Sequence, residues 1–192
     1  MIKAVIFDCF GVIMTDALKV VRAELLATRP EAAKELIDTI HATNRGLVSA
    51  AALSRKIASL LHMSPKQCEA FLSQGEVRDE RVLDFVAELR ATYKTALLSN
   101  VSSGGLAQRF TAEELDHYFD VVVVSGDVGF AKPEAAVYEM TADRLGVRPN
   151  ECVMVDDLER HCQGAEGVGM HAILYESLDQ LKQALQPLLA TN

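Results

Sequence analysis

The sequence of 192 residues predicts an α/β protein whose core is a doubly wound parallel sheet. Three observations lead to this prediction. Short runs of apolar, mostly β-branched residues alternate with amphipathic helical patterns. Most runs are followed by turn or polar residues. One long stretch near the N-terminus carries helical patterns only, so we also expect a small all-helical cap.

The strands of the predicted sheet are apolar at nearly every position, which is typical of parallel strands buried on both faces. They are expected at residues 3–7, 94–98, 121–124, 152–155 and 172–175. Helices of the core are expected at residues 111–117, 134–145, 160–167 and 178–189. The first of these helices begins with Thr111 and Glu114 at the spacing of a capping box.

Residues 15–92 contain no convincing strand, but they contain five patterns of apolar residues at helical spacing. This is more helix than one crossover connection between neighbouring parallel strands needs. We therefore predict a helical cap at residues 15–92 and a core formed by residues 1–14 and 93–192. The last helix of the inserted stretch, residues 79–93, is expected to return the chain to the sheet.

Composition excludes several classes of partner. The formal net charge of -8 and the pI near 5.1 argue against binding to nucleic acid or to an anionic membrane. The four cysteines show no metal-ligand or CxxC spacing, so we expect them to be reduced and buried. No signal peptide or membrane-spanning stretch is evident, which predicts a cytoplasmic protein. The oligomeric state does not follow from these features.

Chemically distinctive residues follow four of the predicted strands, where ligands bind in open α/β sheets. They are Asp8, Ser99, Asn100, Lys132, Asp156 and Asp157. A carboxylate nucleophile, a hydroxyl, a lysine and an acidic pair are the groups needed to hold a phosphoryl group and a divalent cation. Mg²⁺ prefers carboxylate and water oxygens, and it offsets repulsion between an anionic nucleophile and an anionic substrate.

At these positions the chain resembles the haloacid dehalogenase-like hydrolases. The resemblance lies in residues 5–13, 97–100, 126–133 with Tyr138, and 153–157, in that order along the chain. It implies a Rossmann-like core and a helical cap between the first two motifs. It also implies a small phosphorylated molecule as substrate and Mg²⁺ as cofactor.

The resemblance further implies a role for each matching residue. Asp8 would be the nucleophile that forms an aspartyl-phosphate, Ser99 would bind the transferring group, and Lys132 would neutralise its charge. Asn100, Phe10 and Gly11 would line the substrate site. Mg²⁺ would be held by Asp8, Asp157, Asp156 and the backbone carbonyl of Phe10.

Phe10 departs from the family pattern, because phosphatases of this family usually carry Asp there as the general acid and base. Phenylalanine cannot transfer a proton, and a positioned acid or base typically contributes about a hundred- to ten-thousand-fold in rate. His161 and Asp16 are candidate substitutes. For His161, a solvated position on a helix is the favoured expectation.

Three functions are therefore open from the sequence. The first is a Mg²⁺-dependent phosphatase or phosphotransferase that tolerates Phe10, with weakened activity. The second is a haloacid dehalogenase-type hydrolase that uses Asp8 without metal, since a departing halide needs no proton. The third is a weakly catalytic or non-catalytic protein that binds phosphate or another ligand. The identity of the substrate depends on cap side chains, which the sequence alone does not place.

Overall fold

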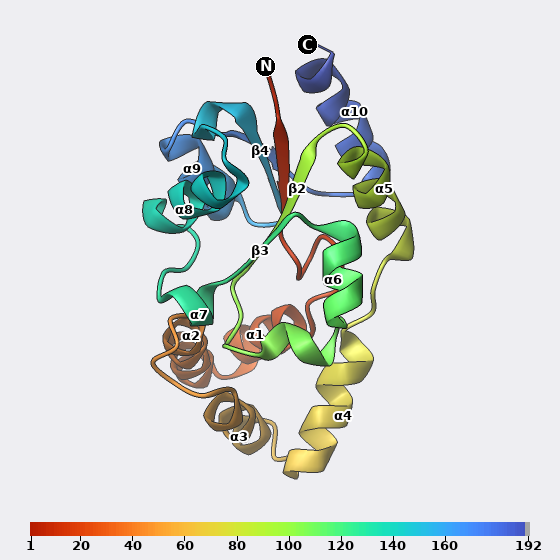
Figure 1. The fold of residues 1–192 in the computed structure, drawn as a ribbon. Coiled ribbons are helices and arrows are strands. Elements are labelled where there is room, and N and C mark those ends of the chain that lie inside the picture. The colour runs from red at the N-terminus through yellow and green to blue at the C-terminus, as the bar shows by residue number, and fades with distance from the viewer. Residues whose placement is uncertain (191–192) are drawn as a thin grey trace.

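The structure is a computed structural model that describes residues 1–190. In this part of the chain, five parallel strands form one sheet in the order β3-β2-β1-β4-β5 (Figure 1). The strands are β1 (Ala4–Phe7), β2 (Lys94–Ser99), β3 (Val121–Val124), β4 (Cys152–Asp156) and β5 (His171–Leu174). All five predicted strands are present, with ends that differ by one residue at most.

The register of the sheet brings the carboxyl ends of the three central strands to one edge. Phe7 of β1 pairs with Leu97 of β2 on one side and with Val155 of β4 on the other. The residues that follow these three positions therefore emerge side by side. This edge carries the chemically distinctive residues predicted from the sequence.

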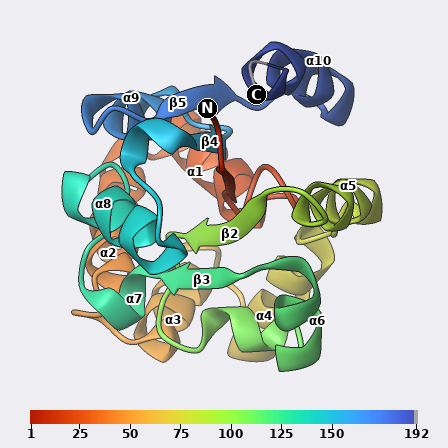
Figure 2. The ribbon, with the colours of Figure 1, turned by 45° about the horizontal axis from the view of Figure 1, so that its top comes forward.

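Helices cover both faces of the sheet (Figure 2). One face packs against α5 (Glu80–Arg90), α6 (Ala112–Tyr118) and α10 (Leu178–Leu189). The other packs against α8 (Ala135–Leu145) and α9 (Glu159–Gly167). Alternate side chains of each central strand enter the two cores, as Phe7 and Ile6 of β1 illustrate. The predicted doubly wound α/β fold is confirmed.

Local sequence signals explain several helix starts. Thr111 and Glu114 form the expected capping box at α6, and Asp79 caps α5 by accepting a bond from the Arg81 amide. Three short helical segments were not predicted: η1 (Gly105–Gln108), α7 (Ser125–Val128) and η2 (Pro149–Glu151). They are single turns, too short to show a helical period in the sequence.

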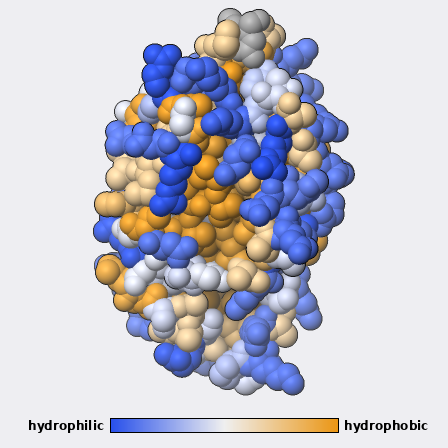
Figure 3. Space-filling view, viewed as in Figure 1, coloured by the Kyte–Doolittle hydropathy of each residue, from blue (hydrophilic) through white to orange (hydrophobic). Residues whose placement is uncertain are grey.

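The expectation that every strand is buried on both faces is wrong for the two edge strands. Only Ile173 of β5 is buried, and Val121 and Val122 of β3 are partly exposed. Figure 3 shows that apolar surface gathers over this β3 edge, at the centre of the face in view. An edge strand has a neighbour on one side only, so helices shield it less completely.

Four further helices lie beyond the carboxyl edge of the sheet (Figure 1). They are α1 (Ala17–Thr28), α2 (Pro30–Asn44), α3 (Ala50–Leu60) and α4 (Pro65–Gly75). They share an apolar cluster of their own, centred on Leu25, Leu36 and Ile57, apart from the two clusters of the sheet. The division into a core and a cap at residues 15–92 stays a prediction, and this separate cluster supports it. The helix α5 packs on the sheet, as expected for a returning helix.

Two further expectations concern the cysteines and insertion into a membrane. All four cysteines are buried and free, as their spacing predicted. Among residues 1–190, none of the helices combines the length and apolarity needed to cross a bilayer.

Leu36→Ala tests the separate cluster of α1 to α4. Leu36 is completely buried, so we expect the substitution to lower the free energy of unfolding by about 2–5 kcal/mol, measured by urea denaturation. Leu26→Ala on α1 is the matched control because Leu26 is 53% exposed, and its effect should stay within about 0.5 kcal/mol. Equal effects from the two substitutions would show that Leu36 is not part of a packed apolar cluster.

Candidate active site

Asp8 follows β1 directly, and the sheet fixes its backbone. The Asp8 amide donates to the Val155 carbonyl at 2.9 Å, which continues the pairing of β1 with β4. Its side-chain Oδ1 accepts a bond of 2.6 Å from the Cys9 amide. The carboxylate is almost fully buried, with 6% of the residue exposed, yet it lines the large cleft between the sheet edge and the helices α1 to α4. Asp8 is therefore a rigidly held carboxylate at the base of an open cleft.

Lys132 lies between two carboxylates. Its Nζ is 2.8 Å from Asp8 Oδ1 and 2.6 Å from Asp156 Oδ2, and its side chain has no exposed surface. Asn100 holds the Lys132 backbone from both sides, donating to the Lys132 carbonyl and accepting from the Lys132 amide at 2.9 Å each. The expected substrate contact of Asn100 stays a prediction, since its side-chain amide is engaged in positioning Lys132.

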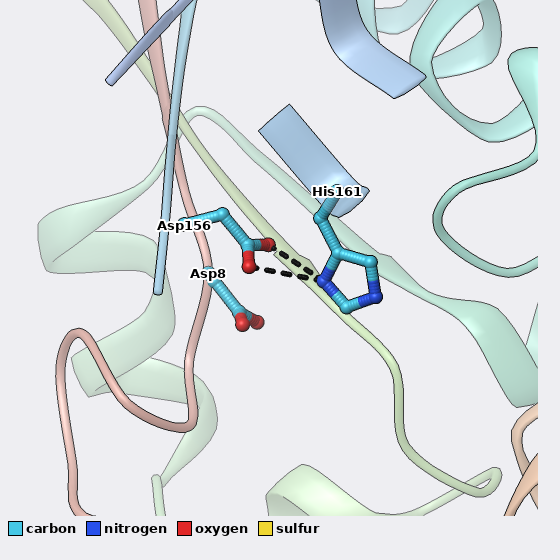
Figure 4. Close-up of side chains that lie close together, drawn as sticks. All are labelled: Asp8, Asp156 and His161. Carbon is cyan, nitrogen blue, oxygen red and sulfur yellow. Dashed lines mark hydrogen bonds and ion pairs between the residues drawn. The ribbon is translucent and has the colours of Figure 1, made fainter. Parts of the chain in front are cut away.

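Asp156 is completely buried and bonded through both oxygens. Besides Lys132, its carboxylate accepts from the Leu158 amide at 3.0 Å and meets His161 Nδ1 at 3.0 and 3.1 Å. Figure 4 shows the His161 ring and the Asp8 carboxylate both close to the Asp156 carboxylate. This arrangement places Asp156 at the centre of a charged cluster that it forms with Asp8, Lys132 and His161.

The expectation of a solvated His161 is wrong. His161 is 3% exposed because the first turn of α9 lies against the sheet edge, and its carbonyl accepts a bond of 2.7 Å from the Tyr138 hydroxyl. Its Nε2 is buried without a hydrogen-bond partner among the described residues. The sequence carried one signal for this position: His161 stands five residues after Asp156, within reach across the turn that joins β4 to α9.

The cluster carries an excess of buried negative charge. Burial, together with the nearby Asp156 carboxylate, raises the pKa of Asp8 to about 7 despite the opposing effect of Lys132. Burial would also raise the pKa of Asp156, but Lys132 and His161 hold that pKa well below its usual range. The pKa of Lys132 is raised because the two carboxylates outweigh the cost of its burial. Burial and the Lys132 charge lower the pKa of His161, which favours a neutral ring.

Asp157 lies against the turn after β1. A Cβ atom on Gly11 would stand 2.3 Å from Asp157 Cγ, and Gly11 has a φ of +95°, so a side chain is excluded there on both grounds. Asp157 Oδ2 is 2.7 Å from Nζ of Lys19, an exposed residue of α1. Lys19 of α1 thus pairs directly with Asp157 at the edge of the sheet, and this contact was not predicted from the sequence.

Phe10 lines the cleft, and a cation covers its ring. The Arg109 guanidinium carbon lies 5.1 Å from the ring centroid, and Glu76 binds that guanidinium at 2.5 and 2.8 Å. All three residues line the cleft. Sequence analysis missed Arg109 and Glu76, because neither stands at the end of a strand or in a motif.

Two other expected residues have different surroundings. Ser99 is completely buried, and its hydroxyl has no hydrogen-bond partner among the described residues. Ser99 does not appear among the residues that line the cleft, and its role stays a prediction. Asp16 lines the cleft, where it caps α1 and pairs with Arg22 at 2.7 Å.

The cleft has a volume of about 1880 Å³ and is bounded by both parts of the molecule. Asp8, Phe10 and Lys132 lie on the sheet side, and residues of α1 to α4 form the opposite wall. A cavity of this size accommodates a metabolite with room for solvent.

The donor set fits a hard divalent cation. Asp8, Asp156 and His161 each offer a ligand atom within 4.8 Å of the others, and Asp157 adds a third carboxylate beside Gly11. Carboxylate oxygens suit Mg²⁺, and buried negative charge in excess of one lysine is the setting that a cation stabilises. The predicted set of Asp8, Asp156 and Asp157 is thus chemically suitable, although the closest group contains His161 in place of Asp157.

The chain is similar to several known proteins. A family profile described as haloacid dehalogenase-like hydrolase matches residues 2–169. N-acylneuraminate-9-phosphatase of Rattus norvegicus is 34% identical over 98 residues, which are 50% of this chain and 40% of the rat protein. Glyceraldehyde 3-phosphate phosphatase of Methanothermobacter thermautotrophicus is 34% identical over 86 residues, 44% of this chain and 38% of that protein. The chain thus matches well under two thirds of these curated relatives' length.

Among solved structures, a HAD family enzyme from Bacteroides thetaiotaomicron in complex with magnesium and inorganic phosphate has a TM-score of 0.73. The match covers 94% of this chain and 99% of that chain at 22% identity, and at that identity it establishes the fold alone.

Asp8→Asn tests the charge excess in the cluster. A carboxyl whose folded-state pKa is raised contributes stability that is present at low pH and lost as pH rises through that pKa. In buffer containing EDTA, we therefore expect Asp8→Asn to gain about 2–4 kcal/mol in unfolding free energy over wild type between pH 4 and pH 8.

Urea denaturation at several pH values measures this gain. Asp84→Asn is the control for loss of a carboxylate, because Asp84 is exposed on α5, and its effect on the unfolding free energy should stay within about 0.5 kcal/mol. If the difference in unfolding free energy between Asp8→Asn and wild type did not change with pH, the ion pair with Lys132 would fully offset the effect of burial on the pKa of Asp8.

Proposed function

The chain belongs to the haloacid dehalogenase-like hydrolases, and within that family we propose that it is a Mg²⁺-dependent phosphatase or phosphotransferase of small phosphorylated metabolites. The observation that carries the proposal is the buried Lys132 ammonium between Asp8 and Asp156, at the base of a cleft. Curated relatives that act as phosphatases support the reaction class.

In the proposed reaction, the Asp8 carboxylate attacks phosphorus and the bond between phosphorus and the leaving oxygen breaks, giving an aspartyl-phosphate. Lys132 is close enough to Asp8 to neutralise charge on the nucleophile and on the phosphoryl group. Water then attacks the phosphorus of the intermediate, which releases phosphate and restores Asp8. The unpartnered hydroxyl of Ser99 is the proposed donor to a phosphoryl oxygen.

Asp8, Asp157 and the backbone carbonyl of Phe10 are the residues that we propose would hold Mg²⁺. Asp156 suits direct ligation less well, because Lys132, His161 and the Leu158 amide already engage its two oxygens. Asp156 is therefore proposed to position Lys132 and His161. When bound, Mg²⁺ would supply positive charge that offsets repulsion between Asp8 and the substrate phosphate.

Phe10 restricts the range of substrates in this proposal. No carboxyl group occupies the position of the usual general acid, and His161 is buried with its Nδ1 on Asp156. The substrates turned over fastest should therefore have leaving oxygens that are weak bases, as in acyl and aryl phosphates.

Phe10 also fits carbon–halogen hydrolysis at Asp8, which is the second candidate function. The three carboxylates of the site argue against it. Without a metal, Asp8, Asp156 and Asp157 would repel the carboxylate of a haloacid, and the two lysines paired with them, Lys132 and Lys19, leave an excess of negative charge.

Hydrolysis of acetyl phosphate and p-nitrophenyl phosphate tests the proposed function. We expect turnover that requires Mg²⁺ and falls by at least about 10³-fold in Asp8→Asn, since the substitution removes the nucleophile. Phe10→Asp should raise turnover of p-nitrophenyl phosphate by about 10-fold or more, because it restores a group that can transfer a proton.

Asp84→Asn serves as the control for these assays, because Asp84 is exposed and remote from the cleft. The dehalogenase alternative would lead if chloride were released from 2-chloropropionate without metal. A non-catalytic binding role would lead if neither wild type nor Phe10→Asp hydrolysed any substrate.

Lys19→Gln tests the proposed metal site without an activity assay. The Lys19 ammonium pairs with Asp157 Oδ2, so a cation bound to Asp157 must displace it. An exposed ion pair is worth about 0.2–1 kcal/mol, so we expect Mg²⁺ to bind Lys19→Gln about 1.5- to 5-fold more tightly.

Isothermal titration calorimetry with Mg²⁺ measures the two affinities. Lys34→Gln is the matched control, since Lys34 is an exposed lysine of α2 away from the site, and its affinity should equal that of wild type. Unchanged or weaker Mg²⁺ binding in Lys19→Gln would argue against Asp157 as a ligand.

A further inference from the structure

Arg109 covers the position at which the site departs from its family. Its guanidinium carbon lies 5.1 Å from the centroid of the Phe10 ring, within the range of a cation–π contact. Arg109 follows η1, in the segment between β2 and α6, so it approaches from the sheet side of the cleft. A permanent positive charge thus lies over the side chain that replaces the usual proton donor.

Glu76 and a backbone carbonyl hold Arg109 in one orientation. Nε and Nη2 of Arg109 contact Glu76 Oε2 at 2.8 and 2.5 Å, and Nη1 donates to the Gly105 carbonyl at 2.6 Å. The Arg109 and Glu76 side chains are only 19% and 11% exposed. These bonds use three of the five N–H groups of the guanidinium, which leaves two for a ligand.

Asp8, Phe10 and Arg109 line the same cleft. The Arg109 side chain and the proposed nucleophile therefore border the same space.

Phosphoryl transfer places negative charge on the leaving oxygen, which a nearby cation can stabilise. When Asp8 attacks phosphorus, the bond to the leaving oxygen breaks and both of its electrons stay on that oxygen. A general acid would neutralise the oxygen with a proton, which Phe10 cannot supply. A fixed cation can instead stabilise the oxyanion, and removal of one such donor typically costs about 10²–10³ in rate.

We propose that Arg109, oriented by Glu76 over Phe10, is a catalytic residue that binds the leaving oxygen and stabilises its negative charge in place of a proton donor. The leaving group departs as an oxyanion and takes its proton from solvent. This inference rests on the proposed phosphotransferase function, and it defines the substrates as esters or anhydrides whose leaving oxygen is a weak base.

The same residue should also contact the product. The hydrolytic water enters from the side that the leaving group has vacated, since each displacement at phosphorus is in line. One oxygen of the released phosphate therefore occupies the position of the former leaving oxygen. Arg109 should strengthen phosphate binding, which gives a test that does not depend on turnover.

The kinetic test compares Arg109→Met and Arg109→Lys with wild type on a series of aryl phosphates from phenyl phosphate to p-nitrophenyl phosphate. We expect log kcat/KM to fall more steeply with leaving-group basicity in Arg109→Met. The loss should be about 10²-fold for phenyl phosphate and only a few-fold for acetyl phosphate. Arg109→Lys keeps the charge and should have an intermediate slope.

Arg90→Met is the matched control. Arg90 also binds a carboxylate, that of Asp120, and backbone carbonyls, but it does not line the cleft. It should therefore lose stability without a change in slope. An equal loss of activity on every substrate in Arg109→Met would overturn the proposal, because it would indicate a role in folding or general binding.

Calorimetric titration with inorganic phosphate in the presence of Mg²⁺ provides the second readout. We expect the Kd to rise by about 10-fold in Arg109→Met and to stay unchanged in Arg90→Met. Absence of turnover in wild type would contradict the proposed function, and the titration would then decide the role of Arg109. Weaker phosphate binding in Arg109→Met would support an oxyanion site, and unchanged binding would overturn it.

Discussion

The buried Lys132 ammonium is the interaction on which the site depends. A charge with no exposed surface is stable only when it is paired and hydrogen-bonded, and Asp8 and Asp156 satisfy this need from neighbouring strands. Asn100 adds two bonds to the Lys132 backbone, which fixes where the ammonium stands. The order of strands in the sheet thus fixes the position of the Asp8 carboxylate beside Lys132. Burial raises the pKa of Asp8, whereas opposite charges in contact lower the pKa of Asp156 and raise that of Lys132.

The excess of carboxylates over lysines links this geometry to function. One lysine cannot neutralise Asp8, Asp156 and Asp157, so the site has a standing affinity for positive charge. Lys19, an exposed residue of α1, neutralises part of this negative charge at Asp157. In the proposed site, a divalent cation and Lys19 of α1 would compete for the Asp157 carboxylate. The cleft between the sheet edge and the helices α1 to α4 would admit the substrate. In the proposed reaction, Arg109 and Phe10 would determine which leaving groups the site can release.

Sequence patterns predicted the fold almost completely, because apolar runs and helical periods reflect which faces are buried. They also predicted the residues at the strand ends, since a parallel sheet brings those ends to one edge. Contacts that depend on how separate elements pack were not predictable. His161 is buried because α9 packs against the sheet. The contact between Arg109 and Phe10 joins segments that are distant in sequence. The exposure of β5 was missed because an edge strand has the composition of a central one.

Trapping the phosphorylated intermediate would show whether Asp8 carries the transferred phosphoryl group, as proposed. The protein would be mixed with acetyl phosphate and Mg²⁺, quenched in acid, digested and analysed by mass spectrometry. The account predicts a peptide that contains Asp8 and has gained the mass of one phosphoryl group, with fragmentation that places the group on Asp8. Turnover of acetyl phosphate with no such peptide, or with the group on another residue, would contradict it.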